Sequence, residues 1–343
     1  MLLSVIIYAA SHIIHYTTDS LVKADVVIGD FKASFVDLDH HSKKKLANKR
    51  DIKGIYENHG VDLYDVEIQQ PLGDLYGLDR IDARKGYDKL YTYPKEAGEG
   101  VTVFIVDTGV QVEHLEFENR ARWGIDTTGE GMMDKIGHGT HVAGIVASKT
   151  YGAAKKAEIV SVKVISKIAD PIEYVIKGLE WVANEVQSKK LKAVVNMSLG
   201  SEYSKVFNEA VAAVVKLGIP VIAAAGNAQK DACGYSPASE ESAITVGATD
   251  RSDTKAFMSN WGPCIDIHAP GIAIVSTWKG PTNTKVVGNS GTSMAAPFVT
   301  AVAALHLSQG KKNIKELILK NATPNVLKLK PNTNTINLFL YNK

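Results

Sequence analysis

From residue 101 onward the chain carries short, continuous apolar segments separated by longer segments of helical periodicity. The apolar segments are four to six residues long and rich in β-branched residues or alanine; they span residues 101–106, 159–164, 194–199, 220–225 and 243–246. Helical periodicity covers residues 172–186 and 206–216. Strands that are buried on both faces and alternate with helices are typical of parallel sheets. The sequence therefore predicts an α/β fold, with helices covering both faces of a parallel sheet.

Composition excludes several classes of function. A net charge of +2 supplies no basic field for nucleic acid. No apolar run reaches the roughly 18 residues that a membrane span requires. The two cysteines are too few for a disulfide framework and are badly spaced for zinc. We therefore expect neither a nucleic-acid partner nor a membrane span. The 343 residues suffice for one large domain with an appendage, or for two domains.

The first 69 residues differ from the rest. Residues 2–10 form an apolar run that ends in small residues, which favours a secretory signal peptide over residues 1–11; a buried N-terminal strand is the alternative. Five of the ten histidines precede residue 60. The pattern that follows predicts strands at 25–28, 31–37 and 63–68 and a helix around 39–49. Such a small unit makes a poor independent core and is stable mainly when docked on a larger domain.

Three polar residues follow glycine-rich turns or buried strands. Asp107 ends the first apolar strand, where the alternative role is to cap a turn. His138 lies between two glycines ahead of an apolar helical run, and no HExxH frame supports zinc binding with His141. Asn227 follows the strand at 220–225 and is a candidate donor to an oxyanion or an ordinary turn residue. Ligands of parallel sheets gather at the carboxyl ends of strands, which favours a shared site.

Ser293 lies between a short strand and a helix that is apolar on nearly every face. Such a helix is buried, and Pro297 is expected in its first turn, where the missing N–H costs nothing. Ser293 is then at the positive end of the helix dipole, as a nucleophile or as a simple N-cap. With Asp107 and His138 it forms the order Asp, His, Ser, which is that of subtilisin. An α/β-hydrolase esterase is excluded because it has another order and a G-x-S-x-G elbow.

The motifs around these residues resemble those of subtilisin-like serine proteases of the proteinase K branch. They are DTGV at Asp107, HGTHVAG at His138, SLG at 198–200, AAAGN ending at Asn227, SPAS at Ser236 and SGTSMAAP around Ser293. The resemblance covers about residues 70–343, which it identifies as the peptidase domain. Residues 12–69 resemble the inhibitory propeptide of the family. All four catalytic positions are filled, which argues against a binding protein that has lost catalysis.

The resemblance implies the role of each site residue. Ser293 would attack the peptide carbonyl, His138 would move the proton, Asp107 would orient His138, and Asn227 would hold the oxyanion. The walls of the substrate cleft would be Ser198, Leu199, Gly200, Ala224, Ala225 and Gly226. Small residues there imply broad cleavage after apolar or aromatic residues. We expect a secreted, monomeric endopeptidase that acts on polypeptides and cuts its own propeptide between about residues 66 and 72, with 66–70 entering the cleft.

Two structural features also follow from the resemblance. No cofactor is expected for catalysis, but Asp266 matches a calcium-binding carboxylate of the family, to which backbone carbonyls near Glu241 and Ala243 would contribute. An ordinary surface aspartate is the alternative. Cys233 and Cys264 match positions of paired cysteines in relatives, and a disulfide is favoured in a secreted chain. Two buried free thiols are the alternative.

Overall fold

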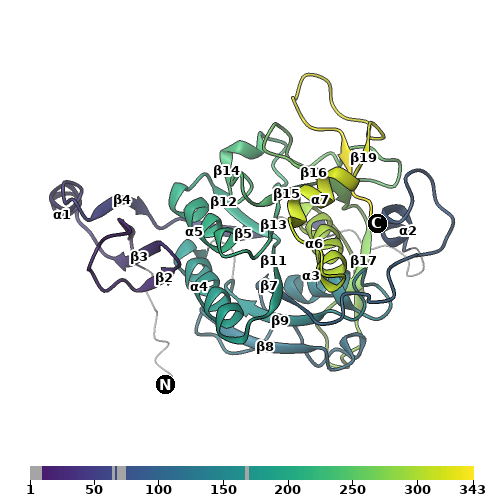
Figure 1. Ribbon diagram of the computed structural model, residues 1–343, viewed down its shortest axis with the longest axis horizontal. Coiled ribbons are helices and arrows are strands. Elements are labelled where there is room, and N and C mark those ends of the chain that lie inside the picture. Colours follow the sequence, from purple (N-terminus) through teal and green to yellow (C-terminus); the bar gives the residue numbers. More distant parts are fainter. Residues whose placement is uncertain (1–9, 64–65, 68–74, 167–169) are drawn as a thin grey trace.

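A computed structural model describes residues 10–63, 66–67, 75–166 and 170–343. Figure 1 shows a small N-terminal unit, drawn in purple, beside a larger body that contains the rest of the chain. The small unit contains β1 (His12–Tyr16), β2 (Val26–Ile28), β3 (Phe31–Val36), α1 (His40–Leu46) and β4 (Ile52–Glu57). Two short strands, β5 (Gly60–Leu63) and β6 (Val66–Glu67), follow it.

The body is built around a nine-stranded sheet in the order β19-β20-β16-β15-β13-β11-β7-β9-β8. All neighbours in it are parallel except β19 and β20. Its strands are β7 (Val101–Asp107), β8 (Ala121–Asp126), β9 (Glu158–Lys163), β11 (Lys192–Met197), β13 (Val221–Ala224), β15 (Ile244–Thr249), β16 (Ile267–Pro270), β19 (Thr323–Pro324) and β20 (Leu338–Phe339). The predicted α/β class is confirmed. The strands at the two sides, β8, β16, β19 and β20, were not predicted.

Helices cover both faces of this sheet, as predicted (Figure 1). They are α2 (Tyr76–Ile81), α3 (His138–Ala147), α4 (Ile172–Lys189), α5 (Lys205–Lys216), α6 (Thr292–Ser308) and α7 (Ile314–Asn321). Alternate residues of β7 supply two separate cores, because side chains of a strand point to opposite faces. Val103 and Ile105 pack in the core that contains α3 and α6, whereas Phe104 and Val106 pack in the core that contains α4 and α5.

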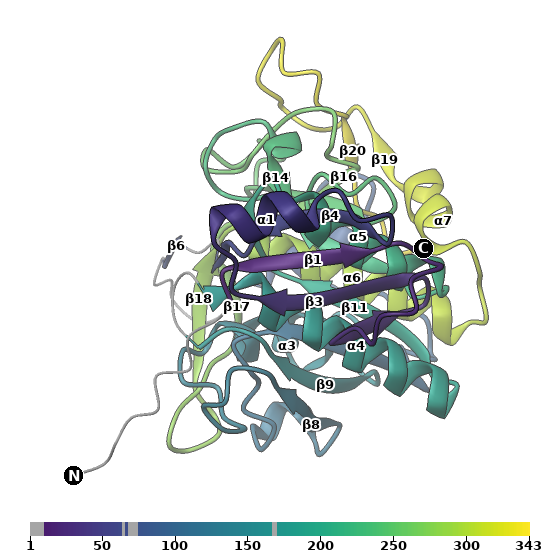
Figure 2. The same ribbon diagram turned by 90° about the vertical axis from the view of Figure 1, so that its left-hand side faces the viewer.

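The N-terminal unit is an antiparallel sheet in the order β2-β3-β1-β4, which faces the viewer in Figure 2. The predicted strands at 25–28 and 31–37 and the helix at 39–49 correspond to β2, β3 and α1. Strands β1 and β4 were not predicted, because each is short and interrupted by histidine, lysine or glycine. Ile13, Val26, Ile28, Phe31 and Ala33 of this unit belong to the same core as α4 and α5. The unit therefore completes its core by docking on those two helices.

The single strand predicted at 63–68 is two separate strands in the structure. β5 lies between β10 (Asp170–Pro171) and β12 (Leu199–Glu202), antiparallel to both, and β14 (Tyr235–Ser236) follows on the other side of β12. β6 pairs with β18 (Val286–Ser290), which also pairs with β17 (Ile274–Thr277), as Figure 2 shows. Each strand thus has its own partner. Residues 64, 65 and 68 of the predicted strand lie outside the described residues.

Helix α6 corrects the expected position of Pro297. Thr292 is the first residue of the helix, so Pro297 is the sixth and lies in the second turn. Proline has no N–H for the carbonyl of Ser293, four residues earlier. The hydroxyl of Ser198 donates to that carbonyl instead, at 2.8 Å. A side chain from the end of β11 therefore satisfies the acceptor that the proline leaves open.

Cys233 and Cys264 form a disulfide whose Cα atoms are 5.3 Å apart. This confirms the predicted pairing. The bond joins the loop after β13 to the loop between β15 and β16. In the part of the chain that the structure describes, none of the helices combines the length and apolar character that crossing a bilayer requires.

Reduction of this disulfide should lower the melting temperature, because the bond restricts the unfolded chain; closing its loop contributes roughly 3–4 kcal/mol on the chain-entropy model. The measurement is a thermal melt with and without reductant. The Cys233→Ala/Cys264→Ala variant is the control and should melt at a temperature that reductant does not change. Equal sensitivity of both proteins would contradict a stabilising disulfide.

Candidate active site

Asp107 and His138 form a buried pair at the carboxyl end of β7. His138 begins α3, and its Nδ1 lies 2.6 Å from Oδ1 of Asp107. Both side chains are fully buried. The same oxygen of Asp107 accepts the N–H of Thr108 at 2.7 Å. Burial raises the pKa of the Asp107 carboxyl, and the adjacent His138 ring opposes this rise.

A second buried carboxylate, Asp134, shapes the turn that leads into His138. Its oxygens accept hydrogen bonds from the N–H groups of Ile136, Gly137 and Thr140 and from the hydroxyls of Thr108 and Thr140. The hydroxyl of Thr108 in turn accepts the N–H of Gly139. Asp134 thus ties the residue after Asp107 to the residues on both sides of His138. The sequence analysis missed this contact; an aspartate four residues before the candidate histidine was the available signal.

Glycines flank His138 because side chains would not fit. Gly137 has a φ of +108°, and a Cβ atom there would lie 2.5 Å from the Trp278 ring. A Cβ atom at Gly139 would lie 2.0 Å from the carbonyl oxygen of Gly109. The close approach between α3 and the loop after β7 therefore requires glycine. This approach brings His138 to Asp107.

Ser293 is the second residue of α6 and is fully buried. Its hydroxyl donates to the carbonyl of Ser198 at 3.1 Å, while the Ser198 hydroxyl donates to the Ser293 carbonyl at 2.8 Å. Asn196 then donates to the Ser198 hydroxyl and accepts from Thr300 on α6. These hydrogen bonds join the end of β11 to the first turns of the helix.

Asn227 is held by the residue next to Ser293. Its Oδ1 accepts both the N–H and the hydroxyl of Thr292, each at 3.0 Å. Because two donors face this oxygen, the Nδ2 group points to the other side of the amide. The same Thr292 hydroxyl accepts the N–H of Gly226 at 3.1 Å. The orientation of Asn227 is therefore determined by the start of α6.

The parallel sheet brings these residues together at the carboxyl ends of neighbouring strands. β7 and β11 are parallel neighbours, with Ile105 opposite Asn196, so Asp107 and Ser198 lie at the same end of adjacent strands. β13 is the next neighbour of β11 and leads to Asn227. Helices α3 and α6, which carry His138 and Ser293, pack on the same face of the sheet.

The predicted substrate-binding residues lie at or just after the carboxyl ends of β11 and β13. Leu199 and Gly200 are in β12 and pair with Leu63 and Asp62 of β5, while Ser198 directly precedes the strand. Ala224 ends β13, and Ala225 and Gly226 continue from it. All six residues are buried.

The sequence offers no support for His141 as a zinc ligand, and it leaves Asp266 as either a calcium ligand or an ordinary surface aspartate. Both residues have contacts with other groups of the protein. His141 directs Nε2 to the carbonyl of Val287 at 3.2 Å and packs edge-on against Trp278, as expected of a structural residue. Asp266 lies beside the carbonyls of Glu241 and Ala243, but the ammonium of Lys315 lies among the three groups. Among the described residues, no group of three or more His, Cys, Asp and Glu side chains is arranged to bind a metal ion.

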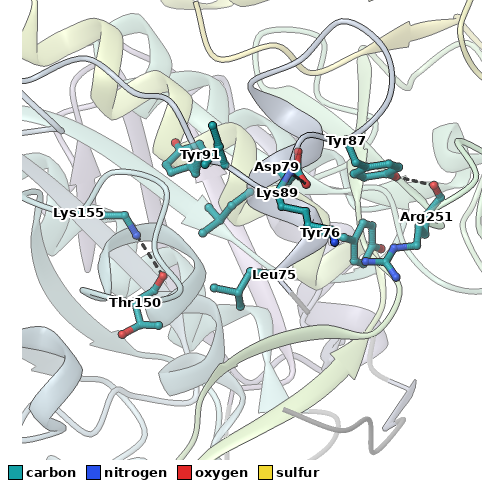
Figure 3. A pocket seen from close by; sticks show the side chains of 11 residues that line it. Leu75, Tyr76, Asp79, Tyr87, Lys89, Tyr91, Thr150, Lys155 and Arg251 are labelled. Carbon is teal, nitrogen blue, oxygen red and sulfur yellow. Dashed lines mark hydrogen bonds between the residues drawn. The ribbon is translucent and has the colours of Figure 1, made fainter. Parts of the chain in front are cut away.

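A cavity of about 780 Å³ lies beside α2 and contains none of the predicted site residues (Figure 3). Tyr87 donates to the carbonyl of Arg251 across it, and Lys155 donates to the carbonyl of Thr150. Burial lowers the pKa of Lys155 to about 8. Tyr76 also lines the cavity and packs near the Tyr87 ring. Neither Asp107 nor His138 lines this cavity.

A buried Asp107–His138 pair at the same end of the sheet as a serine at the start of a buried helix is typical of a serine hydrolase on a parallel α/β sheet. Residues 98–337 match the family described as "Subtilase family". The chain belongs to the subtilase family of serine proteases, which confirms the resemblance of its motifs.

Individual relatives agree with this assignment. The chain is 42% identical over 289 residues to "Subtilisin-like protease 3" of Pseudogymnoascus destructans, a match that spans 82% of this chain and 70% of the relative. It is 43% identical over 260 residues to "Alkaline protease 1" of Aspergillus flavus, over 74% of this chain and 64% of the relative. A crystal structure of a cold-adapted subtilisin-like serine proteinase superposes with a TM-score of 0.71 at 38% identity, covering 78% of this chain and 98% of that chain.

Replacement of Asp134 by asparagine should lower kcat/KM about tenfold to a hundredfold, mostly through kcat. An amide has one acceptor oxygen in place of two, so the turn at His138 shifts, and small displacements of a catalytic group are costly. The measurement is steady-state hydrolysis of a peptide substrate, with the melting temperature recorded in parallel. Glu113→Gln, at an exposed position in the segment after β7, is the control and should retain activity. Unchanged kcat in Asp134→Asn would show that Asp134 does not position His138.

Proposed function

We propose that the chain is a secreted endopeptidase, made as a zymogen, in which Ser293 attacks the peptide carbonyl to form an acyl-enzyme. The observation that carries this proposal is the buried contact of 2.6 Å between His138 Nδ1 and Asp107 Oδ1, at the same end of the parallel strands as Ser293. The subtilase assignment supports it, since the order Asp107, His138, Ser293 is that of subtilisin.

The chemistry follows from the orientation of His138. With Nδ1–H donating to Asp107, Nε2 carries the lone pair and is the ring atom able to accept a proton from the Ser293 hydroxyl. The imidazolium formed in this step is stabilised by the Asp107 carboxylate. His138 then returns the proton to the leaving amine, and a water molecule releases the acyl group by the same route.

The oxyanion of the tetrahedral intermediate needs donors that are in place beforehand. Asn227 meets this requirement because Thr292 holds its Oδ1 and so fixes the direction in which the Nδ2 group donates. The backbone N–H of Ser293 is the second donor, at the positive end of α6. Neither donor has to reorganise when charge develops on the oxygen.

Substrate binds by extending the sheet at β12. The chain's own β5 supports this mode, since it lies antiparallel between β10 and β12 and pairs with Leu199 and Gly200. An extended peptide held in this way presents alternate side chains to the walls of the cleft. The small residues Ala224, Ala225 and Gly226 leave an open slot, from which we infer broad cleavage after apolar or aromatic residues.

The N-terminal unit acts as the inhibitory propeptide. It packs on α4 and α5, and His15 and Lys53 each lie 2.7 Å from the Glu209 carboxylate on α5. Burial acts to raise the pKa of Glu209, but its bonds to His15 and Lys53 outweigh burial and lower the pKa to about 2. Glu209 therefore stays ionised in the docked complex over the whole physiological range.

Two described strands support a processing site near the end of the N-terminal unit. β5 ends at Leu63, which pairs with Leu199 of β12, and β6 pairs Val66 with Ser290 of β18, three residues before Ser293. These pairings support a chain that approaches the proposed nucleophile here. We propose cleavage between about residues 66 and 72, with 66–70 leading into the cleft; residues 68–72 lie outside the described part of the chain.

The proposed domains are a signal peptide over residues 1–11, the propeptide over residues 12–69 and the peptidase domain over residues 70–343. Secretion is supported by the disulfide, which is typical of oxidising compartments, and by the apolar run at 2–10, of which residues 2–9 lie outside the described part of the chain.

Asn227→Ala should lower kcat by about 10²–10³ with little change in KM, because the donor acts mainly in the transition state. This magnitude is the one known for the equivalent residue of subtilisin. The measurement is steady-state kinetics on a peptide substrate, with a thermal melt to show that the fold is retained. A change confined to KM would mean that Asn227 binds the ground state and has no oxyanion role.

Wild-type protein made without other proteases should appear as two fragments, cut between about residues 66 and 72. Ser293→Ala should fold yet remain a single precursor, and so should His138→Ala, because the hydroxyl requires its base. The measurement is gel electrophoresis with N-terminal sequencing of the larger fragment.

Two outcomes would contradict parts of this scheme. Cleavage of Ser293→Ala at the same bond in a protease-free translation system would show that processing is not autocatalytic. A first cut well outside residues 66–72 would show that the propeptide does not end where we propose. Labelling of the wild type, but not of Ser293→Ala, by a serine-directed fluorophosphonate tests the nucleophile independently.

A further inference from the structure

We propose that the ammonium group of Lys315 takes the place of a calcium ion between α7 and the loops that precede β15 and β16. Lys315 is the second residue of α7. Its Nζ atom lies 2.7 Å from the carbonyl oxygen of Glu241, 2.5 Å from that of Ala243, and 2.9 and 3.0 Å from the two oxygens of Asp266. These are the same three groups for which the family resemblance implied a calcium site, with an ordinary surface aspartate as the alternative.

The donor set is of the kind that calcium prefers. Two backbone carbonyls and a bidentate carboxylate supply four oxygens, and calcium takes six to eight oxygen ligands, some of them water. The N–H group of Thr245 donates to Asp266 at 2.9 Å and holds the carboxylate in position. The site is therefore formed by the fold of two loops before any cation is considered.

Lys315 fits this set better than calcium does. An ammonium has three N–H donors, and here three acceptor groups surround it. The distances of 2.5–3.0 Å from Lys315 Nζ to these oxygens are those of hydrogen bonds. A calcium ion in the same place would require its oxygens at about 2.3–2.6 Å. One carboxylate and one ammonium also balance in charge, whereas a calcium ion would have to displace the ammonium or lie against it. A bound calcium ion does not fit the residues present.

The substitution changes what the site does for stability. A bound ion ties two loops together only while the ion is present at sufficient concentration. Lys315 is part of the chain, so its contacts also attach α7 to the loops that lead into two strands of the central sheet. Its side chain is 30% exposed and that of Asp266 is 22% exposed, so the contacts are partly shielded from solvent. The stability of the folded protease should therefore not depend on calcium at this site.

The test compares melting temperatures in EDTA and in millimolar calcium chloride, in the full chain carrying Ser293→Ala so that autolysis does not contribute. The parent protein should melt at the same temperature in both solutions. Adding Lys315→Met should lower the melting temperature in EDTA by roughly 3–10 °C, because the Asp266 carboxylate loses its partner. Calcium should recover part of that loss in this variant, and calorimetric titration should show about one calcium bound per chain.

Two further variants make the test specific. Lys312→Met, which removes an exposed lysine three residues earlier, should melt like the parent and show no response to calcium. Combining Lys315→Met with Asp266→Asn should abolish the response, since the carboxylate is the charged ligand. Stoichiometric calcium binding by the parent with a rise in its melting temperature, or a loss in Lys315→Met that calcium does not reverse, would overturn the proposal.

Discussion

The parallel pairing of β7 with β11 is the constraint on which the active centre depends. It brings the ends of two adjacent strands together, so that Asp107 and Ser198 lie side by side although 91 residues separate them in the sequence. His138 joins Asp107 through α3, and Ser293 joins Ser198 through α6. A break in this pairing would separate Asp107 and His138 from Ser293.

Several polar contacts around the centre compensate for features that would otherwise destabilise it. Pro297 leaves the Ser293 carbonyl without its helical donor, and Ser198 supplies a hydroxyl. Asp134 collects five hydrogen bonds from the turn that glycines make possible. Buried polar groups are costly when unsatisfied, so each contact stabilises the fold while it orients a catalytic group. Stability and positioning are therefore produced by the same atoms.

The N-terminal unit and α7 illustrate how elements outside the catalytic centre depend on the central domain. The unit is too small for a complete core and shares one with α4 and α5. Its continuation, β5, pairs with β10 on one side and with β12 on the other. Lys315 of α7 donates to oxygens of two loops that lie 49 to 74 residues earlier in the chain. In both arrangements the partners are backbone groups of segments next to the central sheet: β12, which follows β11, and the loop before β15.

The sequence by itself determined the α/β class and the candidate residues Asp107, His138, Asn227 and Ser293, because these depend on periodicity and on local motifs; the disulfide was expected from the family resemblance. Only the tertiary structure decided which strands β5 pairs with, why Pro297 is tolerated in the second turn, what Asp134 contacts, and which cation faces Asp266. These features depend on contacts between residues far apart in the chain. Neither local propensity nor motif spacing records such contacts, since both describe only neighbours in sequence.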